Sequence, residues 1–494
     1  MAVREAAPGI RRVKHPSLDE RLGQGRKARD RTPRSSHAEW RVAPDRPDPV
    51  GLLEEQDRTR DPDLVPVRHG RMMVSPFTFY RGAARIMAAD LAGTPVAGLS
   101  AQLCGDAHLS NFGVFASPER RLLFDLNDFD ETLPGPFEYD VKRMAASFVI
   151  AGRNNGFAKA DAQAAVLASV TAYREAMAGF AQMPTTDIWY TQMPEDQLVK
   201  FVQDAVAEVA KKEKEKKAKK AKKERLSEEV AKRAQKNLAK AHTRDSVQAL
   251  SKLAEVVDGQ YRIVSQPPTI VPARDLAAMF GLSPDEAIPA LHDLFRAYRA
   301  TLQDDRRRML ERFAIVDIAR KVVGVGSVGT RAFILLLEGR DAHDPLFLQV
   351  KEATASVLEG YLPRSRYRQH GERVVQGQRL MQAASDIFLG WTKGLDVSRH
   401  FYWRQLRDMK GSALVELMMP ITLTYYGRLC GWTLARAHAR SGDPVAMAEY
   451  LGDDDVFDRS ITEFSERYAD QNERDYEDFV KAIRSGHLQA AEGV

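Results

Sequence analysis

The residues best suited to chemistry lie in one stretch, "LCGDAHLSNFGVFASPERRLLFDLNDFDE", at positions 103–131. Asp106 and Asn111 are five residues apart, as are the proton-accepting aspartate and the magnesium-binding asparagine in the catalytic loop of phosphotransferases. His108, between them, is expected to orient the loop rather than to bind a metal. The spacing therefore predicts a phosphotransfer loop with Asp106, His108 and Asn111 as its catalytic residues.

A second group of oxygen ligands follows two predicted strands, "NFGVFA" and "RLLFDLND". The group consists of Asp125, Asn127, Asp128 and Asp130. Magnesium prefers hard oxygen ligands, and it neutralises the phosphate oxygens that it bridges. We therefore expect Mg²⁺ to be held by Asn111 together with Asp125, Asp128 or Asp130, and ATP to be the bound nucleotide.

A glycine-rich segment lies some 200 residues further on. Gly324, Gly326 and Gly329 form a GxGxxG pattern that also contains Ser327, and the next residues, "TRAFILLL", continue as a strand. A dinucleotide-binding fingerprint must open a helix at this point. A hairpin whose backbone N–H groups cover phosphates is therefore favoured.

Lys351 lies on the next predicted strand, in "LFLQVKEA", where its ammonium group can reach the same phosphates. The alternative is a lysine whose head reaches solvent at the end of the strand. Glu372, on the following helix, is the expected carboxylate partner of Lys351, with Glu359 as the alternative. The strand that ends near Gln405 and Leu406 is expected to face the adenine.

Longer motifs carry a resemblance. "GDAHLSN", "FDLNDFDE" and "GPFEYDVKR" are similar to the aminoglycoside and choline kinase branch of the protein-kinase-like fold. This resemblance implies that Asp128, twelve residues before Asp140, is the metal-binding aspartate rather than Asp125. Segments from "SPFTFYRGAA" to "LCGWTLARAHARSGD" resemble the bacterial family called domain of unknown function 2252 over most of residues 48–490. That likeness implies kinase-like ancestry but no particular substrate.

The order of the motifs differs from that of ordinary kinases, in which the glycine-rich lobe precedes the catalytic loop. A circular permutation accounts for the difference, because domain termini often lie close together at the surface. The predicted fold is α+β and kinase-like, with a small antiparallel sheet lobe, a mainly helical lobe and an added charged helix. The predicted divisions are a disordered basic tail (1–48), a helical lobe with the catalytic and metal loops (49–200), a charged helical extension (201–260), a helical connector (261–314), the sheet lobe (315–410) and a C-terminal helical part (411–494).

Within these divisions, one helix is expected over 75–92, with Ser75 as its N-cap, and another after Ser283 and Pro284. Three consecutive antiparallel strands are expected in 315–353, and "DIFLGWT" and "RHFYWRQLRDMK" are predicted to add two more. Helices are expected to follow to the end of the chain.

The composition bounds the class of protein. Of the 494 residues, 44% are hydrophobic and 29% are charged, as in ordinary globular proteins. The two cysteines, Cys104 and Cys430, cannot build a disulfide framework or a cysteine-rich zinc site, so a reducing cytoplasm is expected. No signal peptide and no apolar run long enough to span a bilayer is recognised, so neither secretion nor a membrane span is expected.

The net charge of +5 is unevenly distributed. Residues 211–225 carry +7 and residues 1–48 carry +5, which leaves about −7 on the rest. Nucleic acid is therefore not the expected partner. The lysine-rich run is expected to form a solvated helix, and its charge suits an acidic partner. The acceptor of the reaction, a small molecule or a protein, is open.

Three alternatives to a phosphotransferase stay open. A metallophosphoesterase shares the "GDAHLSN" pattern, although none of the eleven histidines lies in the GNH or GHxH context that such enzymes need. A kinase-shaped scaffold would bind nucleotide without catalysis, and a third enzyme would transfer AMP instead of phosphate.

Overall fold

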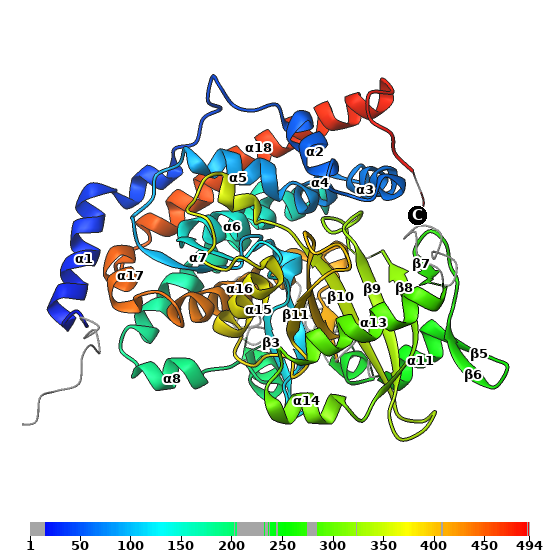
Figure 1. The fold of residues 1–494 in the computed structure, drawn as a ribbon. Helices are drawn as coiled ribbons and strands as arrows, with labels where there is room; N and C mark the ends of the chain where they lie inside the picture. Colours follow the sequence, from blue (N-terminus) through cyan, green and yellow to red (C-terminus); the bar gives the residue numbers. More distant parts are fainter. Residues whose placement is uncertain are drawn as a thin grey trace, which may run out of the picture.

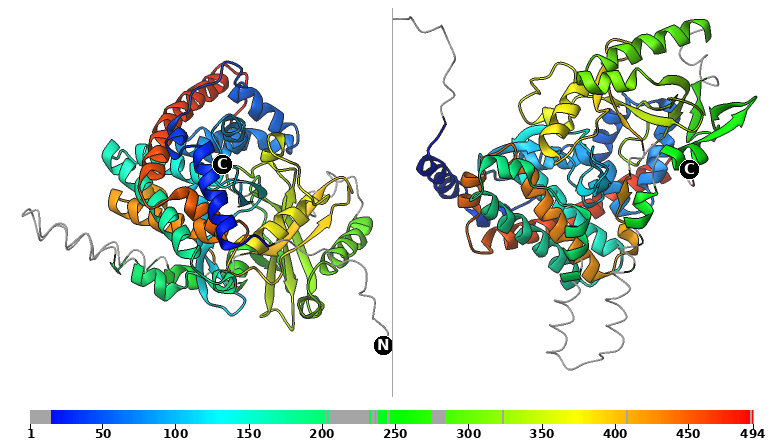
Figure 2. Two further views of the ribbon diagram at one scale, coloured as in Figure 1. Left: turned by 90° about the vertical axis from the view of Figure 1, so that its left-hand side faces the viewer. Right: turned by 90° about the horizontal axis from the view of Figure 1, so that it is seen from below.

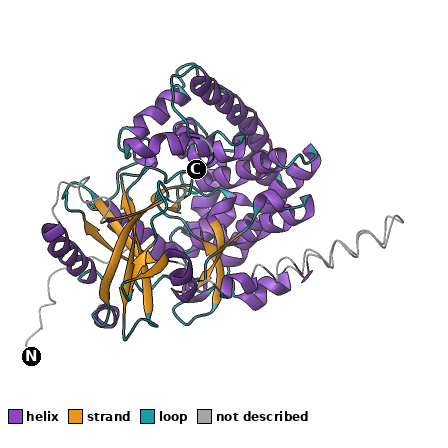
Figure 3. Ribbon diagram, turned by 90° about the vertical axis from the view of Figure 1, so that its right-hand side faces the viewer, coloured by secondary structure: helices purple, strands orange, loops and turns teal. Residues whose placement is uncertain are grey.

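The computed structural model describes residues 15–201, 203–204, 232, 236, 238–243, 246–273, 284–322, 324–406, 409–491 and 493. The fold is mixed α and β, with most strands gathered on one side and most helices on the other (Figure 3). All strand pairings among these residues are antiparallel. Across the same residues, no helix combines the length and apolar character that crossing a bilayer requires.

The largest sheet has the strand order β11-β12-β10-β9-β8-β7. It contains the three strands expected in 315–353 and the two expected after them. The sixth strand was not predicted, because it comes from the proline-rich connector; Pro272 is tolerated there since an edge strand can lack one N–H donor. The strands are β7 (Ile270–Pro272), β8 (Ala314–Lys321), β9 (Ala332–Glu338), β10 (Pro345–Ala353), β11 (Gly390–Lys393) and β12 (His400–Gln405).

Each face of this sheet buries its own apolar cluster. Leu335 and Leu337 of β9 share a cluster with Tyr298 of α13 (Pro284–Arg299). Leu336, between them, belongs to a different cluster with Leu250 of α11 (Ser246–Leu253). Neighbouring residues in a strand point to opposite faces, so a strand covered on both sides must be apolar throughout. This explains the uninterrupted run "AFILLL".

The predicted strand pair in the acidic stretch is present as β2 (Phe112–Ala116) and β3 (Leu122–Leu126). It lies between the helices and the large sheet (Figure 1). Three short strands near this hairpin were not predicted. β13 (Gly411–Ser412) pairs with β2, and β1 (Ser100–Leu103) pairs with β4 (Leu133–Pro136). A separate hairpin, β5 (Ala254–Val257) with β6 (Gln260–Ile263), follows α11.

The helical side packs around α6, α7 and α16, whose buried residues share one apolar core with the β2–β3 hairpin (Figure 1). These helices come from both ends of the chain, so the helical part is discontinuous in sequence. The bounds of these three helices are α6 (Glu138–Asn154), α7 (Lys159–Phe180) and α16 (Pro420–Ala439). Further α-helices are α2 (Pro49–Asp57), α3 (Val65–Met72), α4 (Pro76–Gly82), α5 (Ala84–Ala92), α8 (Thr185–Tyr190), α14 (Asp304–Leu310), α15 (His370–Met381), α17 (Pro444–Leu451) and α18 (Val456–Arg484). Short 3-10 helices are η1 (Arg34–Ala38), η2 (Pro62–Leu64), η3 (Leu109–Asn111), η5 (Val357–Gly360) and η6 (Val415–Leu417).

The predicted disordered tail over 1–48 is wrong for its described part. Residues 18–31 form α1 (Leu18–Arg31), which begins with a capping box between Ser17 and Glu20 and lies beside α17 (Figure 2). Small residues on one face of α1, Gly25 and Ala28, are buried there. The arginine-rich composition hid this helix, because arginines that resemble those of a solvated tail form its ion pairs, such as Arg21 with Asp443.

Two other predictions need comment. The single helix expected over 75–92 is divided at Ala83 into α4 and α5, although Ser75 caps α4 as predicted. The helix expected after Ser283 begins at Pro284, with Ser283 itself outside the described residues. The lysine-rich run 211–225 also lies outside them.

Candidate functional site

The predicted catalytic loop connects β1 to β2, and its backbone is hydrogen-bonded to Asp140 of α6. The Asp140 carboxylate accepts hydrogen bonds from the backbone N–H groups of Cys104 and Gly105, at 2.8 and 3.0 Å. Gly105 has φ +83°, and a Cβ atom at this position would lie 2.2 Å from the carbonyl oxygen of Glu131. Only glycine permits this turn, which brings the loop against the end of the β2–β3 hairpin.

Asp106, His108 and Asn111 lie together in this loop. Asp106 forms an ion pair with Arg143 of α6 at 2.8 Å, and Asn111 donates its side-chain N–H to the backbone oxygen of Asp106 at 2.6 Å. Burial raises the pKa of Asp106, while Arg143 opposes that shift. His108 Nδ1 accepts a hydrogen bond from the Ser110 backbone, and burial lowers the pKa of His108 well below its usual value. His108 is therefore a neutral side chain that shapes the loop.

The acidic group at the end of β3 divides into two parts. Asp125 is fully buried, pairs with Arg436 of α16 and accepts the Ala383 backbone N–H at 2.8 Å. Its oxygens are thus used to join three segments, and the metal role expected as one option for Asp125 is not supported. Asp128 and Asp130, by contrast, line a cavity together with Asp106 and Asn111.

Lys351 of β10 reaches this acidic group. Its Nζ atom lies 2.5 Å from Asp130 Oδ2, and the Tyr402 hydroxyl of β12 donates to Asp130 Oδ1 at 2.7 Å. The expected partnership of Lys351 with Glu372, or with Glu359, is wrong. Glu372 lies in the first turn of α15, where its backbone N–H is capped by the Gln369 side chain, and Glu359 lies 4.0 Å from Arg373.

The glycine-rich segment lies against the same cavity, as the sequence predicted. Gly324, Gly326 and Ser327 line it, and Ser327 Oγ is 3.4 Å from Asp130 Oδ2. The cavity measures about 140 Å³, roughly the space of five water molecules. Gly329 lies just beyond it, with its carbonyl oxygen bonded to the Asp61 N–H at 2.8 Å.

The expected adenine-facing residues do not line this cavity. The backbone N–H of Gln405 donates to the Asp386 carboxylate, and Leu406 packs with the apolar cluster beneath α11. At the end of β12 the Leu406 backbone N–H bonds to the Phe347 carbonyl oxygen of β10 at 2.9 Å. Sequence position alone could not indicate the Gln405 contact, because Asp386 belongs to another segment.

Electrostatics distinguish the two metal candidates. Burial and the neighbouring Asp130 raise the pKa of Asp128, whereas Lys351 holds the pKa of Asp130 below its usual value despite burial. The carboxylates of Asp128 and Asp130 raise the pKa of Lys351 against the effect of burial. Asp130 thus contacts the ammonium group of Lys351 directly, whereas Asp128 feels the charges of Lys351 and Arg404 without an ion pair to either, so its oxygens are the more available to a cation.

The side chains at this cavity that could hold a metal ion offer carboxylate and amide oxygens, the ligand type that magnesium accepts. The described part of the chain contains no cluster of three or more His, Cys, Asp and Glu side chains that could hold a metal ion. Magnesium bound with phosphates commonly takes only one or two carboxylates and completes its shell with water and phosphate oxygens. Asp128, with Asn111 and Asp130 beside it, supplies such a set.

Sequence reasoning missed several residues of the site. Arg143 and Tyr402 bond directly to its aspartates, and Arg404 donates to Gln349 at 2.9 Å while its charge acts on Asp128 and Asp130. Arg404 and Tyr402 alternate on β12 with Trp403, which packs on the other face. That alternation of polar and apolar residues in "FYWRQ" was the available signal.

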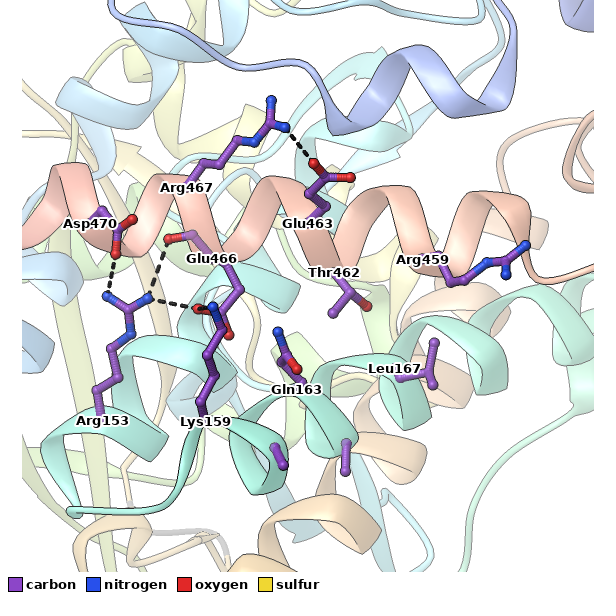
Figure 4. Close-up of a pocket in the computed structure, with 12 residues that line it drawn as sticks. Arg153, Lys159, Gln163, Leu167, Arg459, Thr462, Glu463, Glu466, Arg467 and Asp470 are labelled. Atoms are coloured by element: carbon purple, nitrogen blue, oxygen red, sulfur yellow. Dashed lines mark hydrogen bonds and ion pairs between the residues drawn. The ribbon is translucent and has the colours of Figure 1, made fainter.

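Another hollow, with a volume of about 680 Å³, lies between α7 and α18 (Figure 4). Its main charges satisfy one another, since Arg153 pairs with Glu466 and Asp470 at 2.7 Å each and Arg467 pairs with Glu463. None of the predicted site residues lines it. This groove is larger than the cavity at Asp128 but lacks the predicted chemistry.

Comparison with known proteins identifies a family for this chain. The model of the family described as "Uncharacterized protein conserved in bacteria (DUF2252)" matches residues 60–482, a range that contains the catalytic loop, the glycine-rich segment and Lys351. Neither the curated proteins nor the solved structures yield a match. Because the matched range covers most of the chain, the protein belongs to the bacterial family of domain of unknown function 2252.

Proposed function

We propose that this protein is an ATP- and magnesium-dependent phosphotransferase, with a kinase-like fold in circularly permuted order. One observation carries the proposal: the glycine-rich segment and the acidic loops, some 200 residues apart, line one cavity and are joined by the Lys351–Asp130 pair. Glycine-rich backbone, lysine, metal aspartate and catalytic aspartate are the parts that phosphoryl transfer needs.

The permuted order is supported by the way in which the helical part is assembled. Its catalytic hairpin and α6 precede the sheet in the chain, whereas α16 follows it, and all three share one core. The sheet is thus inserted into the helical part instead of preceding it.

In the proposed reaction the acceptor hydroxyl oxygen forms a bond to the γ-phosphorus of ATP, and the bond from that phosphorus to the bridging oxygen breaks, leaving ADP. Asp106 accepts the hydroxyl proton and positions the acceptor, with its carboxylate held by Arg143. Asp128 and Asn111 would hold magnesium, which neutralises phosphate charge when bound. Lys351 binds phosphate, and the segment from Gly324 covers it.

Phosphate competes with Asp130 for the Lys351 ammonium, and Asp130 becomes available to a cation as the pair separates. At about 140 Å³, the cavity suits the phosphate end of a nucleotide and leaves the nucleoside outside it.

The test is calorimetry with ATP and magnesium on three variants. Asp128→Ala should abolish magnesium-dependent nucleotide binding, because it removes the unpaired carboxylate. Asp106→Ala should bind nucleotide as the wild type does, and should lose ATP turnover. Asp161→Ala, on the exposed face of α7, is the control. Wild-type affinity in Asp128→Ala would contradict the metal assignment, and a wild-type protein indifferent to every nucleoside triphosphate would remove the proposal.

A further inference from the structure

A second set of residues lines the same cavity and has no role in the account above. Gln56, Thr59 and Arg60 come from the end of α2 and the turn after it, and Arg81 comes from α4. All of them precede the catalytic loop in the chain. Two of the four are arginines, although arginine is rarely buried without a partner.

Arg81 is the less compensated of the two arginines. Its Nε atom is buried without a hydrogen-bond partner, and among the described residues its guanidinium group has no ion pair. Its nearest aromatic contact is Phe77, at 6.0 Å from the ring centre. Burial lowers the pKa of Arg81, which reflects a cation held in the protein without full compensation.

Arg60 is more deeply buried, with 7% of its surface exposed. It donates to the Val328 carbonyl oxygen, and its Nε atom lies 3.6 Å from Asp57, too far for a hydrogen bond. Asp57 is shared, since Arg68 and His69 bond to it at 2.8 Å each. Burial and the like charge of Arg68 lower the pKa of Arg60 to about 9.

Three of the five carboxylate side chains that line the cavity pair with other cations, while Asp128 is the proposed metal ligand and Glu131 accepts the Val357 N–H. Asp106 pairs with Arg143, and Asp130 pairs with Lys351. Glu352 pairs with Arg399 at 2.7 Å and with Arg331 at 3.2 Å. A buried cation without its own counter-charge is costly, and an anionic ligand at the cavity would relieve that cost.

The position of Arg81 favours the acceptor over the nucleotide. The charge of Arg81 acts on Asp106, the proposed base, whereas Lys351 and Arg404 are the cations that act on Asp128 and Asp130. The cavity thus has one cationic group beside the proposed metal site and another beside the proposed acceptor site.

Resting on the proposed function, we infer that the acceptor is a phosphate-bearing hydroxyl compound, whose phosphate is bound by Arg81 while its hydroxyl faces Asp106, with Arg60 adding positive charge to the same cavity. A phosphate monoester carries a charge of about −1.5 to −2 at pH 7, which suits a cavity with two arginines in its lining better than a single carboxylate does. The planar guanidinium fork also binds phosphate oxygens in pairs.

The test uses inorganic phosphate as the probe, with the full-length chain and calorimetry. Wild-type protein should bind phosphate both alone and with a saturating non-hydrolysable ATP analogue and magnesium. Arg81→Gln should weaken phosphate binding about 10- to 150-fold, the loss of a hydrogen bond to a charged group, and should leave binding of the ATP analogue unchanged. Arg81→Lys should retain part of the affinity. Arg85→Gln, which removes a half-buried arginine paired with Glu55 outside the cavity lining, is the matched control and should change neither.

Three results would overturn the inference: phosphate binding that survives Arg81→Gln, acetate binding as tight as phosphate binding, or exclusion of phosphate by the ATP analogue. In the last case the arginines serve the nucleotide. Failure of the proposed function is seen separately, because it appears as absent nucleotide binding in the wild type. Phosphate binding that depended on Arg81 in such a protein would still establish the anion site.

Discussion

Replacing Lys351 by methionine should destabilise the ligand-free protein, and added magnesium should reverse part of the loss. The Lys351–Asp130 distance of 2.5 Å corresponds to a gross attraction of about 7 kcal/mol at an effective dielectric of roughly 20. Desolvation offsets much of that gain. Removing one partner of a buried pair nevertheless costs about 3–5 kcal/mol, because it leaves a buried charge unpaired. In Lys351→Met the unpaired charge is that of Asp130, which lies beside the like charge of Asp128.

The assay is urea unfolding of the wild type, Lys351→Met, Asp130→Asn and the double variant, each with and without magnesium. Lys351→Met should lower the free energy of unfolding by about 3–5 kcal/mol. Lys351→Met should cost much less in the Asp130→Asn background, because the neutral asparagine leaves no unpaired charge at position 130. Magnesium at ten times its dissociation constant should restore about 1.4 kcal/mol to Lys351→Met. Lys393→Met, at an exposed position of β11, is the control.

Two results would refute this reasoning. One is a loss below about 1 kcal/mol in Lys351→Met, which is the range of exposed pairs. The other is additivity of the two substitutions within about 0.5 kcal/mol, which is expected of independent sites. Either result would mean that the two lobes are not joined through this pair in solution.

Two further predictions concern the support of the site. Burial raises the pKa of Glu131 from 4.5 to about 7. The native state therefore holds the Glu131 proton more tightly than the unfolded state does. The resulting stabilisation is complete below pH 4.5 and is lost as the pH rises through 7. In urea unfolding at a series of pH values, the wild type should therefore lose up to about 3 kcal/mol relative to Glu131→Gln between pH 5 and 8; a difference independent of pH would contradict this. Gly105→Ala should cost several kcal/mol, because it combines positive φ with a contact of 2.2 Å to backbone, whereas Gly156→Ala, with φ +71° and open space, should cost about 1–2 kcal/mol. Equal losses in the two alanine variants would show that the contact with Glu131 relaxes freely.

The sequence was informative where local pattern and chemistry agree. The strands in 315–353, the β2–β3 hairpin and the cap at Ser75 follow from side-chain periodicity and turn residues. The shared cavity followed from a chemical argument: a glycine-rich hairpin and paired carboxylates are each incomplete without the other. Their convergence was predicted although nothing local indicates it.

The wrong predictions about the site concern which of several similar side chains contacts a given residue. Lys351 had several carboxylates within reach on sequence grounds, and only the three-dimensional packing of β10 against the β3 end selects Asp130 over Glu372. Arg81 gave no signal, because an arginine in "FTFYRGAA" looks like a solvated helix residue. The helix α1 was missed since its stability comes from α17, more than 400 residues away.

The buried bond between Asp125 and Arg436 joins residues 311 positions apart. At a synthesis rate of about 5–20 residues per second, the ribosome needs roughly 15 to 60 s to travel that distance. During this time the nascent hairpin carries an unpaired carboxylate and lacks α16 beside it. Completion of the folded state therefore has to wait until almost the whole polypeptide has been made, and a chaperone that shields the early segments would have its greatest effect in that interval.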